Sequence, residues 1–138
     1  MKKTYQPKKI TRSWHLVDAR EKVLGRMATE IVKMLMGKHK VDYAPQADMG
    51  DYVVVINAKY LRVTGEKKEK KVYYRHSGYP GGFKKISFQK LFTENPRKVV
   101  ELAVKRMLPN NRLRDRRMRR LYVYEENNHP YKNKFVNS

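Results

Sequence analysis

Arginine is concentrated in one short stretch of the chain. Six of the nine residues from Arg112 to Arg120 are arginine, and Asp115 is the one acidic residue between positions 105 and 120. The planar guanidinium group favours bidentate contact with phosphates and stacking on nucleobases. A solvated protein face usually mixes both signs of charge, so this stretch predicts a phosphate-binding surface. Its predicted contact residues are Lys105, Arg106, Asn111, Arg112, Arg114, Arg116, Arg117, Arg119 and Arg120.

A glycine-rich segment flanked by cations offers a second anion-binding element. Gly78, Gly81 and Gly82 would let bare backbone approach phosphates, and Tyr79 could stack or donate a hydrogen bond. An ordinary turn is the alternative interpretation. The predicted contacts here are Arg75, His76, Ser77, Gly78, Tyr79, Gly81, Gly82, Lys84 and Lys85, and Arg26, Lys38, His39 and Lys40 are added from earlier in the chain.

Other chemistry finds less support in the sequence. The turn at 18–25 holds one glycine and matches neither dinucleotide-binding nor P-loop patterns. There is no cysteine, which excludes thiol catalysis and Cys-ligated metals. A divalent-ion hydrolase built on Asp18, Asp48 and Asp51 is conceivable, but caps and surface pairs explain these aspartates better. We therefore predict no catalytic residue, no metal ligand and no cofactor.

The overall charge indicates the class of partner. The 138 residues include 33 Lys and Arg against 13 Asp and Glu, a net charge of +20. Such a chain repels itself, and a polyanion compensates it best. The longest apolar run, Val53 to Ile56, is far shorter than the ~20 residues that span a bilayer. We expect nucleic acid as the partner, with no membrane and no small-molecule substrate.

Hydrophobic periodicity predicts an alternation of strands and helices. Leu24, Met27, Ala28 and Ile31 recur at helical spacing, and Gly37 would end that helix. Strands are expected at 13–18, 51–57, 60–64, 72–74 and 121–124, with the second buried on both faces. Further helices are expected after Ser87, from Asn95-Pro96 to Pro109, and after Asn110 or Asn111, whereas 77–82 should form no regular structure.

This alternation favours a single α/β domain with a mainly parallel sheet. Residues 1–12 form a basic extension, residues 13–124 the α/β core with the Arg-rich segment at 112–120, and residues 125–138 a polar tail with little to bury.

Several motifs follow one another at the spacing of one family. They include Val23-Leu24-Gly25-Arg26, Gly37-Lys38-His39-Lys40, Gly50-Asp51-Tyr52, His76-Ser77-Gly78-Tyr79 and Met107-Leu108-Pro109. From about Trp14 to Tyr124 the chain closely resembles the bacterial-type large-subunit ribosomal protein L-thirteen family. Arg106 departs from the family, which usually has a small residue there, and the arginine density of 114–120 is also unusual.

The resemblance implies a three-layer α/β fold and a structural role in the large ribosomal subunit, early in assembly. The implied partners are large-subunit ribosomal RNA and neighbouring large-subunit proteins, with no cofactor and no catalytic residue. A free repressor of its own messenger RNA is an alternative, and a metal-dependent RNA hydrolase is a weaker one. The thirteen residues before Trp14 leave no room for a transit peptide, so we expect a bacterial cytoplasm rather than an organelle.

Overall fold

A three-stranded parallel sheet organises the computed structural model, which describes residues 9–20 and 22–135. Its strands are β1 (Trp14–Asp18), β2 (Tyr52–Ile56) and β5 (Leu121–Val123), in the order β1-β2-β5. Both neighbouring pairs are parallel. Val53, Val54 and Val55 are fully buried in the middle strand, which confirms the prediction from the continuous apolar run.

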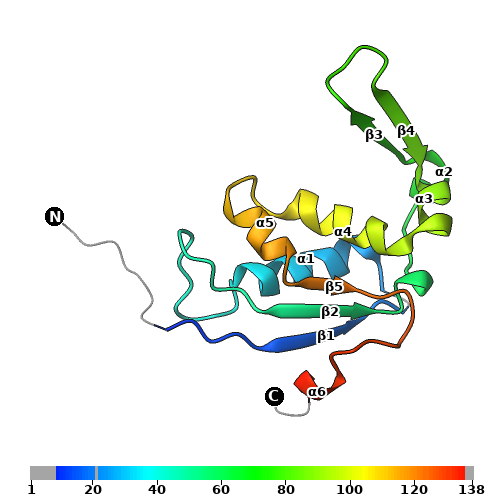
Figure 1. The fold of residues 1–138 in the computed structure, drawn as a ribbon. Helices are drawn as coiled ribbons and strands as arrows, with labels where there is room; N and C mark the ends of the chain where they lie inside the picture. Colours follow the sequence, from blue (N-terminus) through cyan, green and yellow to red (C-terminus); the bar gives the residue numbers. More distant parts are fainter. Residues whose placement is uncertain (1–8, 21, 136–138) are drawn as a thin grey trace.

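Two helices cover one face of this sheet (Figure 1). They are α1 (Leu24–Met36), which ends at Gly37 as predicted, and α4 (Pro96–Met107), whose first turn is capped by the Asn95 side chain. The apolar stripe of α1 is buried between α4 and the sheet. The short helix α3 (Phe88–Glu94) begins after Ser87, whose hydroxyl accepts a hydrogen bond from the Lys90 N–H. These capping predictions are confirmed.

Aromatic rings and the C-terminal segment form the third layer, on the opposite face of the sheet. The parallel register places Trp14 beside Tyr52, and their rings stack at 4.4 Å between centroids. Tyr131 packs on Tyr122 at 4.6 Å and on Trp14 at 5.0 Å, and α6 (Lys132–Phe135) follows directly below the sheet (Figure 1). The prediction that this tail has little to bury is therefore wrong, because its aromatic residues cover the far face.

The strand predicted at 60–64 is also wrong. Residues Ala58–Tyr60 form a 3-10 turn, η1, and Arg62 makes a single bridge with Val23. The backbone of this segment joins the start of α1 instead of a strand. The Leu24 N–H donates to the Arg62 carbonyl, and the Arg62 N–H donates to the Lys22 carbonyl. Its alternating pattern thus reflects packing at a helix end.

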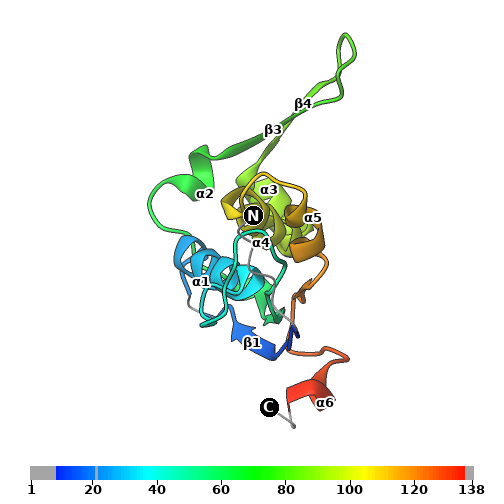
Figure 2. The same cartoon turned by 90° about the vertical axis from the view of Figure 1, so that its left-hand side faces the viewer.

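A β-hairpin projects from the body on the same side of the sheet as the helices (Figures 1 and 2). Its strands β3 (Val72–His76) and β4 (Phe83–Ser87) pair antiparallel, apart from the main sheet, and a short helical turn, α2 (Lys67–Lys70), precedes them. The extended segment at 72–74 and the irregular turn at 77–82 are confirmed, whereas β4 was not predicted. It has exposed lysines on both faces, so it lacks the apolar–polar alternation by which a half-buried strand is predicted.

The Arg-rich segment is the last predicted element to be placed. The Arg-rich segment contains α5 (Leu113–Met118), which packs against α1 and α4. Of the predicted basic extension, residues 1–8 lie outside the described part of the chain, as do residues 136–138 of the tail. Within the described ranges, no helix has the length and apolarity needed to cross a membrane.

Candidate nucleic-acid interface

Glycine backbone geometry closes the hairpin turn. Gly78 and Gly81 have φ of 85° and 73°, in the left-handed region that side chains disfavour. The Ser77 N–H donates to the Gly82 carbonyl, and the Gly82 N–H donates to the Tyr79 carbonyl. A Cβ atom at Gly78 or Gly81 would meet nothing within 4 Å. The backbone at the tip is therefore open to a ligand, while its conformation already requires glycine.

The strands of the hairpin carry the cations that were predicted to flank a loop. Arg75 pairs with Lys84, so these two residues share one face, whereas Lys85 lies opposite Tyr74 on the other face. All three cationic side chains are exposed, and none forms an ion pair with another described residue. No acidic residue occurs between Lys71 and Thr93. The structure thus gathers the predicted contacts of 75–85 into one uncompensated positive element.

The Arg-rich segment presents a second exposed set of cations. The Asn111 side chain accepts a hydrogen bond from the Leu113 N–H at 3.0 Å, which fixes the start of α5. Arg112, Arg116 and Arg119 are exposed and Arg114 is half-buried. Lys105 lies across a groove of about 230 Å³ between α4 and α5, where Asp115 faces it.

Two of the predicted contact arginines, Arg117 and Arg120, face inward. The Arg117 side chain is 1% exposed, and its Nε lies 4.0 Å from an Asp48 oxygen. Arg120 binds both carboxylate oxygens of Asp48, one of them at 2.6 Å, and donates to the Leu35 carbonyl at 2.9 Å. They point into the body because the side chains at 113, 117 and 120 share one face of the helical segment. Arg120 is thus held inside the protein, whereas Nε and Nη1 of the buried Arg117 have no hydrogen-bond partner among the described residues. Burial of both side chains argues against the prediction that they contact RNA.

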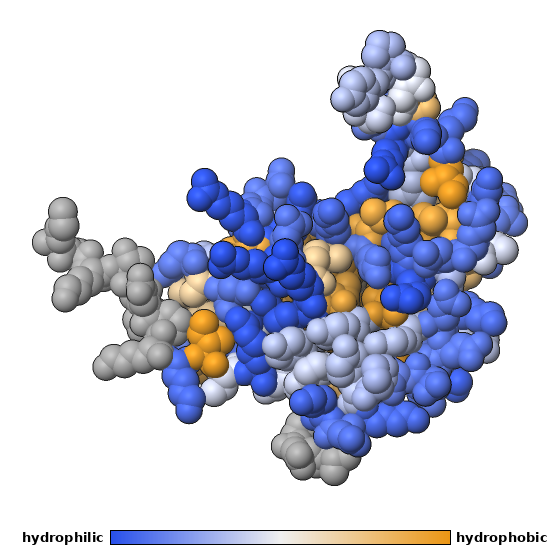
Figure 3. All heavy atoms as spheres, in the orientation of Figure 1, coloured by the Kyte–Doolittle hydropathy of each residue, from blue (hydrophilic) through white to orange (hydrophobic). Residues whose placement is uncertain are grey.

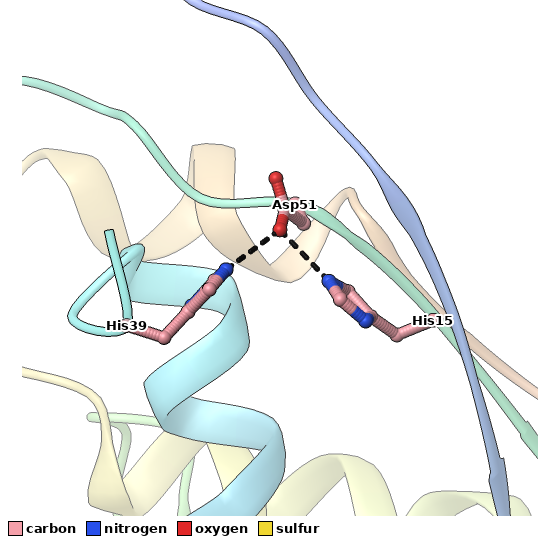
Figure 4. Close-up of side chains that lie close together, drawn as sticks. All are labelled: His15, His39 and Asp51. Carbon is pink, nitrogen blue, oxygen red and sulfur yellow. Dashed lines mark hydrogen bonds and ion pairs between the residues drawn. The ribbon is translucent and has the colours of Figure 1, made fainter. Parts of the chain in front are cut away.

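Asp51 is the centre of a second buried charge cluster (Figure 4). Its side chain is 1% exposed, and one carboxylate oxygen contacts His15 Nε2 at 2.8 Å and His39 Nε2 at 2.9 Å. The other oxygen contacts the Lys40 ammonium at 2.7 Å and accepts from the Ser13 N–H at 3.1 Å. Burial raises the pKa of Asp51, but the hydrogen bonds from Lys40, His15 and Ser13 outweigh burial and lower that pKa to about 2.

This cluster changes the interpretation of the 38–40 segment. The Lys40 ammonium also donates to the carbonyls of Thr11 and Met49 at 2.6 Å and 2.8 Å. All three of its donors are used within the protein, which argues against the prediction that the Lys40 ammonium contacts RNA. His39 is tied to Asp51 while remaining 40% exposed, and Lys38 is exposed.

The same three side chains present ligand atoms for a metal ion. The nitrogens of His15 and His39 and an oxygen of Asp51 lie within 4.8 Å of one another. That oxygen already accepts from both imidazoles, and the Lys40 ammonium on the other oxygen would repel a cation. The geometry of these three side chains therefore favours a hydrogen-bonded cluster over a metal site.

A third basic site was missed by the sequence analysis. Lys67, Lys71 and Arg106 line a pocket of about 200 Å³ beside Gly25 at the start of α1. The Arg106 guanidinium and the Lys71 ammonium each lie 5.2 Å from the centroid of the Tyr73 ring. Burial and the neighbouring charges of Arg106 and Lys67 lower the pKa of Lys71. Arg106 therefore belongs with the base of the hairpin, whereas Arg26 is exposed on α1. Only the spatial approach of three distant segments creates this pocket.

Comparison with known proteins gives a consistent result. The family model described as Ribosomal protein L13 matches residues 12–130. A protein of Pseudomonas paraeruginosa named large ribosomal subunit protein uL13 is 53% identical over 131 residues, which cover 94% of this chain and 92% of the relative. Proteins of the same name from Hahella chejuensis and Thermotoga maritima are 49% and 50% identical, over 91% of this chain and 89% and 85% of theirs.

Proposed function

This chain belongs to the ribosomal protein L13 family, and on that premise we propose that it binds and stabilises folded large-subunit ribosomal RNA as a structural constituent of the large subunit. The family is a structural component of the ribosome and not an enzyme, so the hydrolase alternative is set aside. The protein acts in the bacterial cytoplasm, where the ribosome is assembled.

The observation that carries this proposal is a pair of exposed cation sets that form no ion pair with any residue in the described part of the chain. One set comprises Arg75, Lys84 and Lys85 on the hairpin, and the other Arg112, Arg116 and Arg119 around α5. The ion pairs between described residues involve other cations. Cations that meet phosphates release condensed counterions, which favours binding to RNA.

The position of the two sets favours folded RNA over a single short strand. The hairpin and α5 both stand on the helix side of the sheet, and most of the surface visible there is hydrophilic (Figures 1 and 3). The hairpin projects from the body, whereas α5 packs on the body against α1 and α4. An RNA that contacts both must bring two of its own segments together, which is how such a protein would stabilise a tertiary fold.

Charge removal from α5 tests the phosphate contacts. The triple variant Arg112→Gln, Arg116→Gln, Arg119→Gln should bind a large-subunit ribosomal RNA transcript with a flatter plot of log affinity against log salt. The slope should fall by about 2–3 units if each side chain meets a phosphate. The matched control Lys33→Gln, Lys59→Gln, Lys90→Gln removes the same charge from exposed positions outside the interface. An equal change of slope in both triples would contradict a localised contact at α5.

Sedimentation tests the cellular role. In a sucrose gradient of a lysate, the protein should migrate with the large subunit at both low and dissociating magnesium. A peak confined to the top of the gradient would overturn the ribosomal assignment. Binding to its own messenger RNA uses the same surface and stays a prediction.

A further inference from the structure

Two large aromatic rings lie side by side in solvent on one face of the hairpin. Tyr74 is 63% exposed and Phe83 is 57% exposed. Their ring centroids are 5.7 Å apart and their planes differ by 23°, so the pair is stacked. Exposed apolar area that is gathered in one place indicates a contact surface.

The strand register defines what surrounds the rings. Tyr74 lies opposite Lys85 and His76 lies opposite Phe83, so these four side chains share one face. That face therefore combines two rings with an imidazole and an ammonium group. The root of the hairpin is anchored, because Tyr73 is 6% exposed and stacks on the buried Phe88 at 6.3 Å. The rings are held on a short strand pair whose base is fixed in the core.

The chemistry of this face selects nucleobases as its occupant. Aromatic side chains bind unpaired RNA bases by stacking, and nearby cations hold the adjoining phosphates. The absence of acidic residues from 71 to 93 suits a polyanion. A hydrophobic protein partner would cover the rings but would leave Lys85, on the same face, without a counter-charge.

We propose that the Tyr74–Phe83 face is a stacking platform for an unpaired nucleobase of ribosomal RNA. This inference rests on the proposed function and adds a mode of recognition to it. The phosphate contacts of α5 position RNA without regard to its bases, whereas the platform requires a base that is free of its own helix. It therefore selects loops or bulges over continuous duplex.

The test separates bases from phosphates. The full chain is titrated with a short oligouridylate and with an abasic oligomer of the same length and charge. The double variant Tyr74→Leu, Phe83→Leu keeps apolar bulk but removes both π faces. It should lose on the order of tenfold in affinity for oligouridylate and should bind the abasic oligomer as the unaltered chain does.

Two further variants control for folding and for location. Phe83→Trp enlarges the stacking surface and should retain or increase the affinity for oligouridylate. Tyr60→Leu removes another exposed tyrosine, which is 54% accessible and lies in η1, outside the hairpin, and should change neither affinity. Equal affinity of the unaltered chain for both probes, or an equal loss on both in the double variant, would overturn the platform. The α5 salt slope and the gradient profile would still report independently on the proposed function.

Discussion

Arg119 and Arg120 are neighbours in the chain with opposite surroundings. Arg119 is exposed, whereas the Arg120 guanidinium binds Asp48 and the Leu35 carbonyl inside the protein. Replacing Arg120 with Ala would leave Asp48 as a mostly buried charge that lacks this partner. We expect the free energy of unfolding to fall by about 3–5 kcal/mol. Arg119→Ala should change it by less than about 0.5 kcal/mol. Urea unfolding of both variants measures the difference, and similar values would contradict the inward role of Arg120.

The Asp51 cluster should make stability depend on acid pH. The pKa of Asp51 in the folded protein is about 2, below its ordinary value of 3.8. Because the folded pKa is the lower one, the contribution is complete above pH 4 and is lost as pH falls through 2. It amounts to roughly 2 kcal/mol. Urea unfolding between pH 5 and 2 should show this loss in the unaltered chain and in Asp42→Asn, but not in Asp51→Asn. A loss that persists in Asp51→Asn would assign it to other carboxyl groups.

Periodicity and capping rules correctly predicted the helices and strands whose formation depends on residues close together in the chain. The stripe of α1, its end at Gly37, the caps at Ser87 and Asn95, and the buried β2 all follow from periodicity and capping. The failures have non-local causes. The 60–64 segment alternates because it packs at the start of α1, and β4 lacks alternation because it has no buried face along most of its length.

The candidate interface also has parts that the sequence could predict and parts that it could not. The clustering of charge in the sequence predicted the hairpin and α5 as candidate sites. Cations that have no acidic neighbours in the sequence also have none nearby when their segment is exposed. It could not separate Arg117 and Arg120 from their neighbours, since Asp48 lies about seventy positions earlier in the chain. It also missed Lys67 and Lys71, which become a site only when Arg106 of α4 reaches them.

In the complete fold, the C-terminal tail covers the face of the sheet that lies opposite the helices, a role that the sequence analysis did not predict for this tail. Tyr131 packs against Trp14 and Tyr122, which lie 117 and 9 positions before it. Tyr131→Ala should lower the free energy of unfolding by about 2 kcal/mol and shift the fluorescence of Trp14, the one tryptophan of the chain. Tyr60→Ala, at an exposed position, should do neither. Unchanged Trp14 emission in Tyr131→Ala would contradict the third layer.

The two inward arginines also have a consequence for the order of events during synthesis. The chain is made from its N-terminus, so Asp48 and the Leu35 carbonyl exist long before Arg117 and Arg120 arrive. Until then Asp48 has the Arg12 guanidinium 3.8 Å away but lacks the two inward arginines, and the parallel partner β5 is missing from the edge of β2. Folding of the core is thereby coupled to translation of its last strand. A chain that stops short of Arg117 lacks β5 and both inward arginines, so its hairpin and its helices α1 and α4 belong to an incomplete sheet.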